Sequence, residues 1–340
     1  MSGISRQDHS SLIFGILGCL ICFYITSSAS FFKKNFLNFI LLYLASYATL
    51  MNTNFNQIAG FLFFLIMTGY YSFLKKNDYC SGLFWGLAVA IKLFPGLLFI
   101  FALSKQRYKI FWTMLFVLLA TWSLPLISMG PKIYLQFFKT ISTLIWYGNT
   151  WNASIYGFLF RLFVDLNNPH NVSAIKISYQ IIFIFILLWY SRELYKPKIQ
   201  INPHYGFCLS LIIMLLLSPF GWMYYFALLF MPLILIYQSL GQDKSNKKIM
   251  LWYLCLFLLN LPIANFQTRS LEWLPKIGLY SSYFYGLVLV LYLFLYTLKV
   301  NAKIKLLTEP SNSNYLMPVE FILGFSVFIV FTTLLRYWYL

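Results

Sequence analysis

Apolar runs separated by short polar or basic loops dominate the chain. About twenty apolar residues form a helix long enough to cross the hydrocarbon core of a bilayer, and shorter runs suffice where neighbouring helices cover their ends. The pattern therefore predicts an all-α polytopic membrane protein, with about ten transmembrane helices. The predicted spans lie near residues 11–30, 36–51, 58–74, 110–129, 174–190, 206–218, 221–238, 249–264, 279–298 and 317–335.

The stretch 82–108 interrupts this pattern, because Lys92 and Pro95 lie among otherwise uncharged residues. A lysine at bilayer depth normally faces a partner or a water-filled cavity, and a proline breaks the helix that contains it. Basic residues such as Lys75 and Lys105 flank the stretch, so the positive-inside rule places both of its ends in the cytoplasm. The stretch is therefore predicted to be a re-entrant or broken helix pair that lines a polar cavity. The alternative is a kinked span whose Lys92 reaches the interface.

The composition excludes a soluble domain, because 61% of the residues are hydrophobic, 10% are charged and the mean hydropathy is +0.74. The net charge of +17 comes from basic residues that fall mostly in short loops on one side of the predicted membrane. It is therefore a topology signal and predicts no nucleic-acid partner. Three histidines and five cysteines are scattered along the chain, which predicts neither a side-chain metal site nor a disulfide framework, and we expect no cofactor.

The chain is predicted to form a single integral membrane domain, 1–340, in which residues 131–173 are an extracytoplasmic loop. The first part of this loop places apolar and polar residues at helical spacing, which is typical of a helix lying in the interface plane. Further along, Asn152, Ser154 and Arg161 are polar residues among aromatic ones. Arginine suits phosphate recognition, because its planar fork makes two charged hydrogen bonds, although it equally suits lipid headgroups.

Two other segments on the same predicted side carry candidate binding residues. Trp222, Tyr224 and Tyr225 follow Ser218 at the start of a span. Aromatic faces combined with hydroxyls suit the wall of a sugar site, and the same composition is typical of an interfacial belt. Gln57 lies in a polar, uncharged turn between two spans, where its amide is available for hydrogen bonds unless the turn is simply solvated.

Acidic residues are scarce, and few of the eight lie on the predicted non-cytoplasmic side. Asp8 is the acid nearest the first apolar span on that side, and its neighbour His9 is able to share a proton. We therefore assign Asp8 as the candidate catalytic base, with Asp165 and Glu272 as alternatives. Against this assignment, a residue close to a chain end is usually mobile, whereas a base must be held within hydrogen-bond reach of its proton.

Three stretches, read together, resemble glycosyltransferase family eighty-seven of the GT-C superfamily. They are GLAVAIKLFPGLLF, NTWNASIYGFLFRL and LSPFGWMYYFALLFMPLIL, in that order. The resemblance covers about residues 54–240. Tyr224 and Tyr225 depart from the family pattern, since histidine is usual there. The matching motif residues are Lys92 and Pro95 of Lys-x-x-Pro, then Asn152, Ser154, Gly157 and Arg161 of the second motif, and Ser218, Pro219 and Trp222 of Ser-Pro-x-x-Trp.

The resemblance implies an enzyme that moves a hexose, with mannose expected, from a polyprenyl-phosphate sugar donor to a lipid or glycan acceptor. It implies a bacterial inner (plasma) membrane protein, surrounded by membrane lipids, whose active site faces the periplasm or exterior. Lys92 and Arg161 would then bind phosphate, with the polar and aromatic residues named above around the sugar. The family's catalytic aspartate belongs to the first large extracytoplasmic loop, and this chain is expected to lack that loop and the preceding span. The alternatives are a transporter or lipid-handling protein, or an inactive truncated relative.

Overall fold

The computed structural model describes residues 10–26, 37, 40–41, 43–144, 146–165, 172–240, 246–265 and 273–300. Within these ranges the regular elements are helices, and pairing between extended segments is limited to one isolated bridge. Four helical segments are long and apolar enough to cross a membrane: Tyr108–Met129, Val172–Leu194, Met223–Leu240 and Trp273–Lys299. Five apolar helical segments are shorter: Ser10–Thr26, Ala59–Leu74, Asp78–Ile91, Phe94–Ser104 and Pro203–Leu217.

These segments confirm the all-α membrane fold, whereas about ten spans remains a prediction. The predicted span 317–335 lies outside the described residues, as does part of 36–51, where the structure describes α3 (Tyr47–Asn54). Among the shorter segments, Ala59–Leu74 and Pro203–Leu217 have most of their residues buried, which fits a membrane protein because neighbouring helices allow a short helix to stand within the bundle.

The helices α1 (Ser10–Thr26) and α4 (Ala59–Leu74) run side by side in the same direction. Glycines allow this close contact: a Cβ at Gly18 would lie 2.8 Å from the Phe63 ring, and one at Gly60 would collide with the backbone carbonyl of Ser11. Small residues at such positions are typical of membrane helix pairs, because association there depends on close packing.

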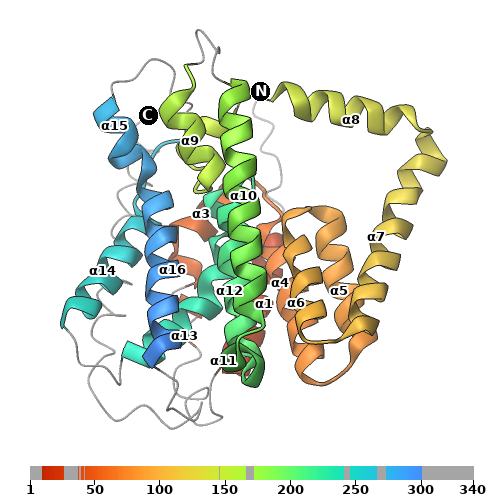
Figure 1. The fold of residues 1–340 in the computed structure, drawn as a ribbon, viewed down its shortest axis with the longest axis horizontal. Helices are drawn as coiled ribbons and strands as arrows, with labels where there is room; N and C mark the ends of the chain where they lie inside the picture. The colour runs from red at the N-terminus through yellow and green to blue at the C-terminus, as the bar shows by residue number, and fades with distance from the viewer. Residues whose placement is uncertain are drawn as a thin grey trace, which may run out of the picture.

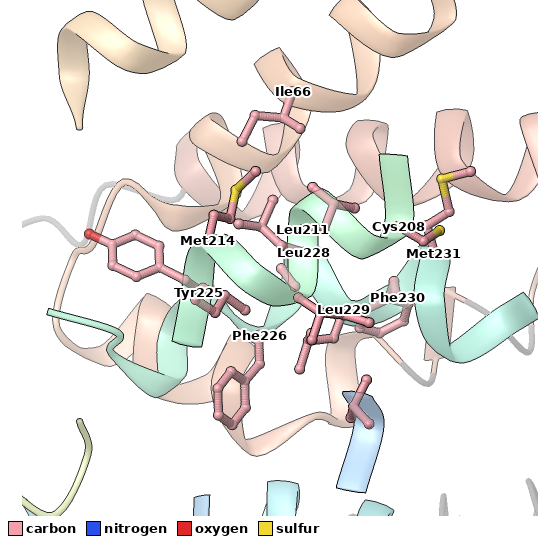
Figure 2. Packing of buried hydrophobic residues seen from close by; sticks show 14 of the residues in the cluster. Ile66, Cys208, Leu211, Met214, Tyr225, Phe226, Leu228, Leu229, Phe230 and Met231 are labelled. Carbon is pink, nitrogen blue, oxygen red and sulfur yellow. The ribbon is translucent and has the colours of Figure 1, made fainter. Parts of the chain in front are cut away.

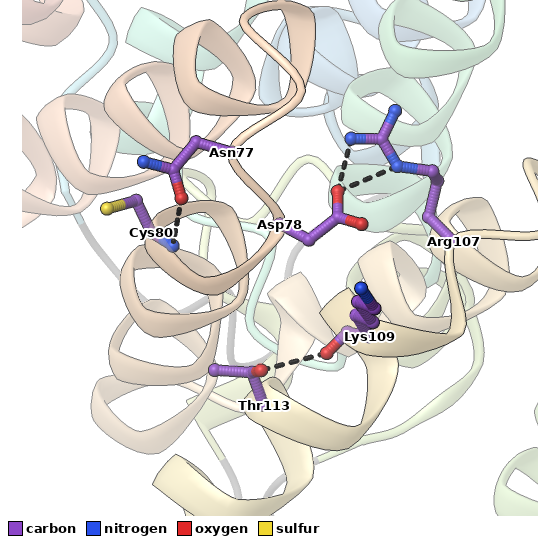
Figure 3. Close-up of polar contacts among 6 residues, drawn as sticks. All are labelled: Asn77, Asp78, Cys80, Arg107, Lys109 and Thr113. Atoms are coloured by element: carbon purple, nitrogen blue, oxygen red, sulfur yellow. Dashed lines mark hydrogen bonds and ion pairs between the residues drawn. The ribbon is translucent and has the colours of Figure 1, made fainter.

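The predicted break near Lys92 is present. The helix α5 (Asp78–Ile91) ends just before Lys92, whose backbone is extended, and Pro95 lies in the short helix η1 (Phe94–Gly96). The chain then returns as α6 (Leu97–Ser104). An ion pair between Asp78 and Arg107 joins the two ends of this hairpin, with Nε of Arg107 2.7 Å from the Asp78 carboxylate (Figure 3). The broken helix pair is therefore confirmed as a hairpin.

The helix α12 (Pro203–Leu217) occupies the centre of the molecule, and its residues from Tyr205 to Leu217 are buried. Apolar side chains surround the whole circumference of this helix, which is the pattern of a helix covered on every side. Figure 2 shows part of this core, where Leu211 and Met214 pack with residues of η3 (Met223–Leu229) and α13 (Phe230–Leu240). The helix α16 (Ser282–Val300) also packs against α12.

The helix α7 (Tyr108–Met129) lies at the right edge of Figure 1, and α10 (Val172–Leu194) runs down the middle of that view in the foreground. Their outward faces expose large apolar side chains, including Phe116 (72% exposed), Ile127 (79%) and Phe185 (69%). Apolar surface of this extent is expected where lipid is the solvent. The remaining elements are η2 (Trp146–Gly148), α8 (Lys132–Thr143), α9 (Ile155–Phe163), α11 (Pro197–Ile201), α14 (Asn246–Asn260), α15 (Trp273–Ile277) and η4 (Leu279–Ser281).

The bundle has two chemically different ends. The basic end holds the loops after α4, α6 and α10, which carry Lys75, Lys105 and Lys196, and Nζ of Lys105 donates to the Ile199 carbonyl at 2.6 Å. The opposite end, here called the motif end, holds the turns 54–57, 92–95, 146–155 and 218–222, and it faces the top of Figure 1. The segregation of basic loops fits the topology that the sequence predicts.

Candidate active site

The second and third motifs are joined by backbone hydrogen bonds at the motif end. The amide of Ala153 donates to the Gly221 carbonyl at 2.8 Å, and the amide of Met223 donates to the Trp151 carbonyl at 2.9 Å. These bonds form the isolated antiparallel bridge between Asn152 and Trp222. Two segments some seventy positions apart are thereby held in one fixed register.

Asn152 is the central support of this junction. Its carboxamide nitrogen donates to the carbonyls of Tyr147 and Pro219, both at 2.9 Å, and its oxygen accepts from the amide and the hydroxyl of Ser154 at 3.2 and 2.9 Å. The side chain is 0% exposed, and Ser154 in turn accepts from the Gly157 amide at the start of α9. The structure therefore places Asn152 and Ser154 inside the loop, with their polar groups directed at the protein itself.

Arg161 is also buried, at 1% exposure. Its Nη1 donates to the carbonyl of Asn149 at 2.7 Å and to that of Asn152 at 3.4 Å, while its Nε donates to the hydroxyl of Ser281 at 3.1 Å. Burial lowers the pKa of Arg161 to about 10, so the guanidinium stays charged at neutral pH. A buried cation paired with carbonyls instead of a carboxylate makes the electrostatic potential of this loop positive.

Aromatic rings stack in a row along the junction. The row, here called the aromatic row, consists of Tyr147, Phe220, Trp222 and Tyr224, with successive ring centroids 4.7, 6.3 and 5.9 Å apart and nearly parallel planes. Phe220, Trp222 and Tyr224 are partly exposed. Phe220, Trp222 and Tyr224 come from the turn that leads into η3 and from the start of η3, and their rings form one stack.

The aromatic row continues into the first motif. The ring of Tyr225, which is buried, lies 5.1 Å from that of Tyr224 and 5.0 Å from that of Phe94, two residues after Lys92. Lys92 itself is exposed at the carboxyl end of α5. The structure thus places this lysine at the surface of the motif end, two residues before Phe94 and outside the packed core, and the polar cavity predicted around it stays a prediction.

The first polar turn reaches the same region. Gln57 is half-buried, its carbonyl accepts from the Ser11 hydroxyl at 2.6 Å, and its amide nitrogen donates to the Phe55 carbonyl at 3.2 Å. The Phe55 ring meets that of Trp151 edge-on, with centroids 5.2 Å apart. Ser218 is buried and its hydroxyl accepts from the Phe220 amide at 3.2 Å. The three motif stretches and the turn that holds Gln57 are therefore connected at one end of the bundle.

The candidate acids are distributed unevenly. Asp8, the predicted base, and Glu272 lie outside the described residues. In the described part of the chain, Asp78 and Glu193 form ion pairs with Arg107 and Lys196 at the basic end. Asp165 is exposed at the motif end, two residues after the end of α9.

Sequence reasoning missed Tyr147, Phe220 and Phe94 as members of this site. The signal available for Phe220 was its place in the aromatic-rich stretch FGWMYY of the third motif. Tyr147 and Phe94 have no such local signal, since they join the row only through contacts with residues far away in the chain.

Fold and site together define a multi-pass α-helical membrane protein with a cationic and aromatic site at one end of its bundle. A model of glycosyltransferase family 87 matches residues 11–219, which is more than half of the 340 residues. The chain belongs to this family of membrane glycosyltransferases, as the three motifs indicated. The match includes Lys92, Asn152 and Arg161 and ends before Trp222. Comparisons with curated proteins and with solved structures found no match.

Proposed function

We propose that this glycosyltransferase moves a mannosyl group from a polyprenyl-phosphate sugar to a lipid or glycan acceptor at the motif end. One observation carries the proposal: the three motif stretches and the turn that holds Gln57 meet at the end of the bundle opposite the basic loops. By the positive-inside rule that end faces away from the cytoplasm, and in a bacterial inner membrane it would face the periplasm. Lipid-linked sugar donors suit a site at a membrane surface.

The aromatic row supplies the sugar-binding face of the proposed site. Trp222 and Tyr224 present partly exposed rings, and the C–H faces of a hexose stack on such rings while hydroxyls bond to the phenol. Tyr225, which is buried beneath them, supports the row. Gln57 belongs to the adjoining turn and is placed to offer its amide at the edge of the site.

Lys92 is the cation proposed to bind the donor phosphate. It is exposed, close to the aromatic row, and its compact ammonium suits a phosphate that gains charge as the glycosidic bond breaks. Arg161 acts differently, because its donors are already used by carbonyls and a hydroxyl. We therefore assign Arg161, together with Asn152, Ser154 and Ser218, to positioning the loop that carries the row.

The reaction requires a base. The acceptor hydroxyl attacks the anomeric carbon, the bond from that carbon to the phosphate oxygen breaks, and the hydroxyl proton passes to a carboxylate. The polyprenyl phosphate leaves with the bonding electrons. We retain Asp8 as the proposed base and compare it with Asp165, the acid that the structure places at the motif end.

The test is transfer by the purified chain in proteoliposomes supplied with radiolabelled polyprenyl-phosphate mannose and a membrane lipid extract. We expect label in the lipid or glycan fraction, with none transferred from a nucleotide-linked mannose. The variants Asp8→Asn and Asp165→Asn, each checked for unchanged thermal unfolding, then identify the base. Absence of transfer from the lipid-linked donor, combined with protein-dependent uptake of solute into the vesicles, would replace the enzyme with the transporter alternative.

A further inference from the structure

The segment 261–265, here called the connector, follows α14 and lies against the second motif. The indole N–H of Trp151 donates to the Ile263 carbonyl at 2.7 Å, and the hydroxyl of Thr150 donates to the Ala264 carbonyl, also at 2.7 Å. Trp151 is 2% exposed and Thr150 is 0% exposed. Two consecutive donors of the second motif therefore meet two consecutive acceptors that lie 112 and 114 positions further along the chain.

Residues from three helices hold the connector in place. The Tyr47 hydroxyl donates to the Ile263 carbonyl at 3.3 Å, and the Tyr47 amide, at the first residue of α3, donates to Oδ1 of Asn260 at 3.2 Å. Tyr283 of α16 donates its hydroxyl to the Leu261 carbonyl. Hydrogen bonds to buried groups are costly to leave unmade. The connector is therefore fixed by α3, α14 and α16 at once, and the acceptor that it presents to Trp151 has a set position.

Trp151 links the connector to the rest of the site. Its backbone carbonyl accepts from the Met223 amide at 2.9 Å, and Met223 follows Trp222 of the aromatic row. Its ring meets that of Phe55 edge-on, with centroids 5.2 Å apart, and Phe55 belongs to the turn that holds Gln57. A single buried side chain and its backbone therefore contact the connector, the third motif and the first polar turn together.

We propose that Trp151 and the connector set the position of the aromatic row, which makes Trp151 a positioning residue for sugar transfer. Misplacing a bound reactant by about 1 Å costs about a hundredfold in rate, even when the change lies far from the reacting atoms. The matched region 11–219 contains Trp151, whereas the carbonyls that hold its indole come from beyond that region. The effect on rate rests on the proposed function, but the effect on the position of the row does not.

The kinetic test is Trp151→Phe, which keeps an aromatic ring and removes the indole N–H. The matched control is Trp85→Phe in the same core, because Trp85 is 0% exposed and its indole N–H also donates to a backbone carbonyl, that of Ile66, at 3.0 Å. Each substitution removes one buried donor, so both should lower the Tm to a similar extent. Trp151→Phe should in addition lower kcat by about tenfold to a hundredfold, whereas Trp85→Phe should not.

The change in Trp151→Phe should appear in kcat and leave KM for the sugar donor nearly unchanged. The rings of the aromatic row are all present in this variant and still bind the sugar, but the anomeric carbon is displaced from the geometry of attack. If Trp151→Phe fails to fold, Thr150→Val gives the same kinetic test, because it removes only the hydroxyl that bonds to Ala264. Kinetic constants of Trp151→Phe equal to those of Trp85→Phe would overturn the positioning role.

The position of the row is tested without sugar transfer by fluorine NMR of the full chain, labelled with 5-fluorotryptophan, in detergent micelles. The Trp222 resonance, assigned through Trp222→Phe, should shift in Thr150→Val. It should stay in place in the control Thr121→Val, whose lost hydroxyl bonds to carbonyls of its own helix α7. An unchanged Trp222 resonance in Thr150→Val would reject the inference. If the parent chain transfers no sugar, the proposed function fails and this resonance alone decides the role of the connector.

Discussion

Replacing Asn152 with alanine would remove the side chain that holds the second and third motifs together. The substitution deletes two donated hydrogen bonds, to the carbonyls of Tyr147 and Pro219, and two accepted from Ser154. A typical intramolecular hydrogen bond contributes about 1 kcal/mol net, so the four together contribute about 4 kcal/mol. Asn152 is 0% exposed, which means that the carbonyls left behind have poor access to bulk water. The loss is therefore expected at or above this figure.

The expected loss converts to a temperature shift through the entropy of unfolding. Taking about 2.1 cal/mol/K per residue for the whole chain, a loss of about 4 kcal/mol lowers the Tm by about 6 °C. The assay is thermal unfolding in detergent followed by a thiol-reactive dye, since Cys19, Cys22, Cys208 and Cys255 are buried and react only on unfolding.

The matched control is Asn54→Ala, which removes an exposed carboxamide from the same end of the molecule. It should leave the Tm within about 1 °C of the parent, as is usual for surface substitutions. Asn152→Asp keeps the shape but directs an anion at two carbonyls, so it should destabilise the protein at least as strongly as alanine. A Tm for Asn152→Ala equal to that of Asn54→Ala would refute the assignment of Asn152 as the structural support of the site.

Three further outcomes follow from the site. Lys92→Gln should reduce transfer by about tenfold to a hundredfold and leave the Tm unchanged, because a hydrogen bond to a charged group contributes about 1.5–3 kcal/mol. Lys109→Gln is the control variant and should remain active. Trp222→Ala should raise KM for the sugar donor more than it lowers kcat, because stacking stabilises the ground state and the transition state alike. Trp112→Ala, on the outer face of α7, should alter neither constant. Arg161→Lys should lower the Tm although the charge is kept, because the lysine ammonium lacks the planar, forked guanidinium that reaches Asn149 and Ser281 together. A Tm equal to the parent's would contradict the positioning role of Arg161.

Local patterns were enough to predict the helical elements and the break at Lys92 and Pro95. A helix requires only an apolar stretch of sufficient length, and a proline disrupts backbone hydrogen bonds within its own turn. The amphipathic spacing before Tyr147 likewise predicted α8, because the two sides of a helix are set by residues three and four positions apart. The order of the motifs was enough to indicate the family, which the match over residues 11–219 confirms.

Long-range packing decided which of the motif residues are exposed. The motif pattern did not distinguish Asn152, Arg161 and Trp222 as candidate binding residues. In the structure Asn152 and Arg161 are buried supports, whereas Trp222 presents a partly exposed ring. Exposure depends on what covers a residue, and the covering groups come from distant parts of the chain, as Ser281 does for Arg161 across 120 positions. No local periodicity encodes such contacts.

The same distinction between local sequence and tertiary packing applies to the site as a whole. The sequence by itself determined that aromatic rings, an arginine and a lysine occur near the ends of apolar helices on one side of a membrane. Tertiary structure alone decided that Tyr147 stacks on Phe220, that Tyr225 meets Phe94, and that Lys92 lies at the surface beside them. The physical reason is that each of these contacts is fixed by the packing of several helices at once, whereas hydrophobic length and charge bias are properties of each segment separately.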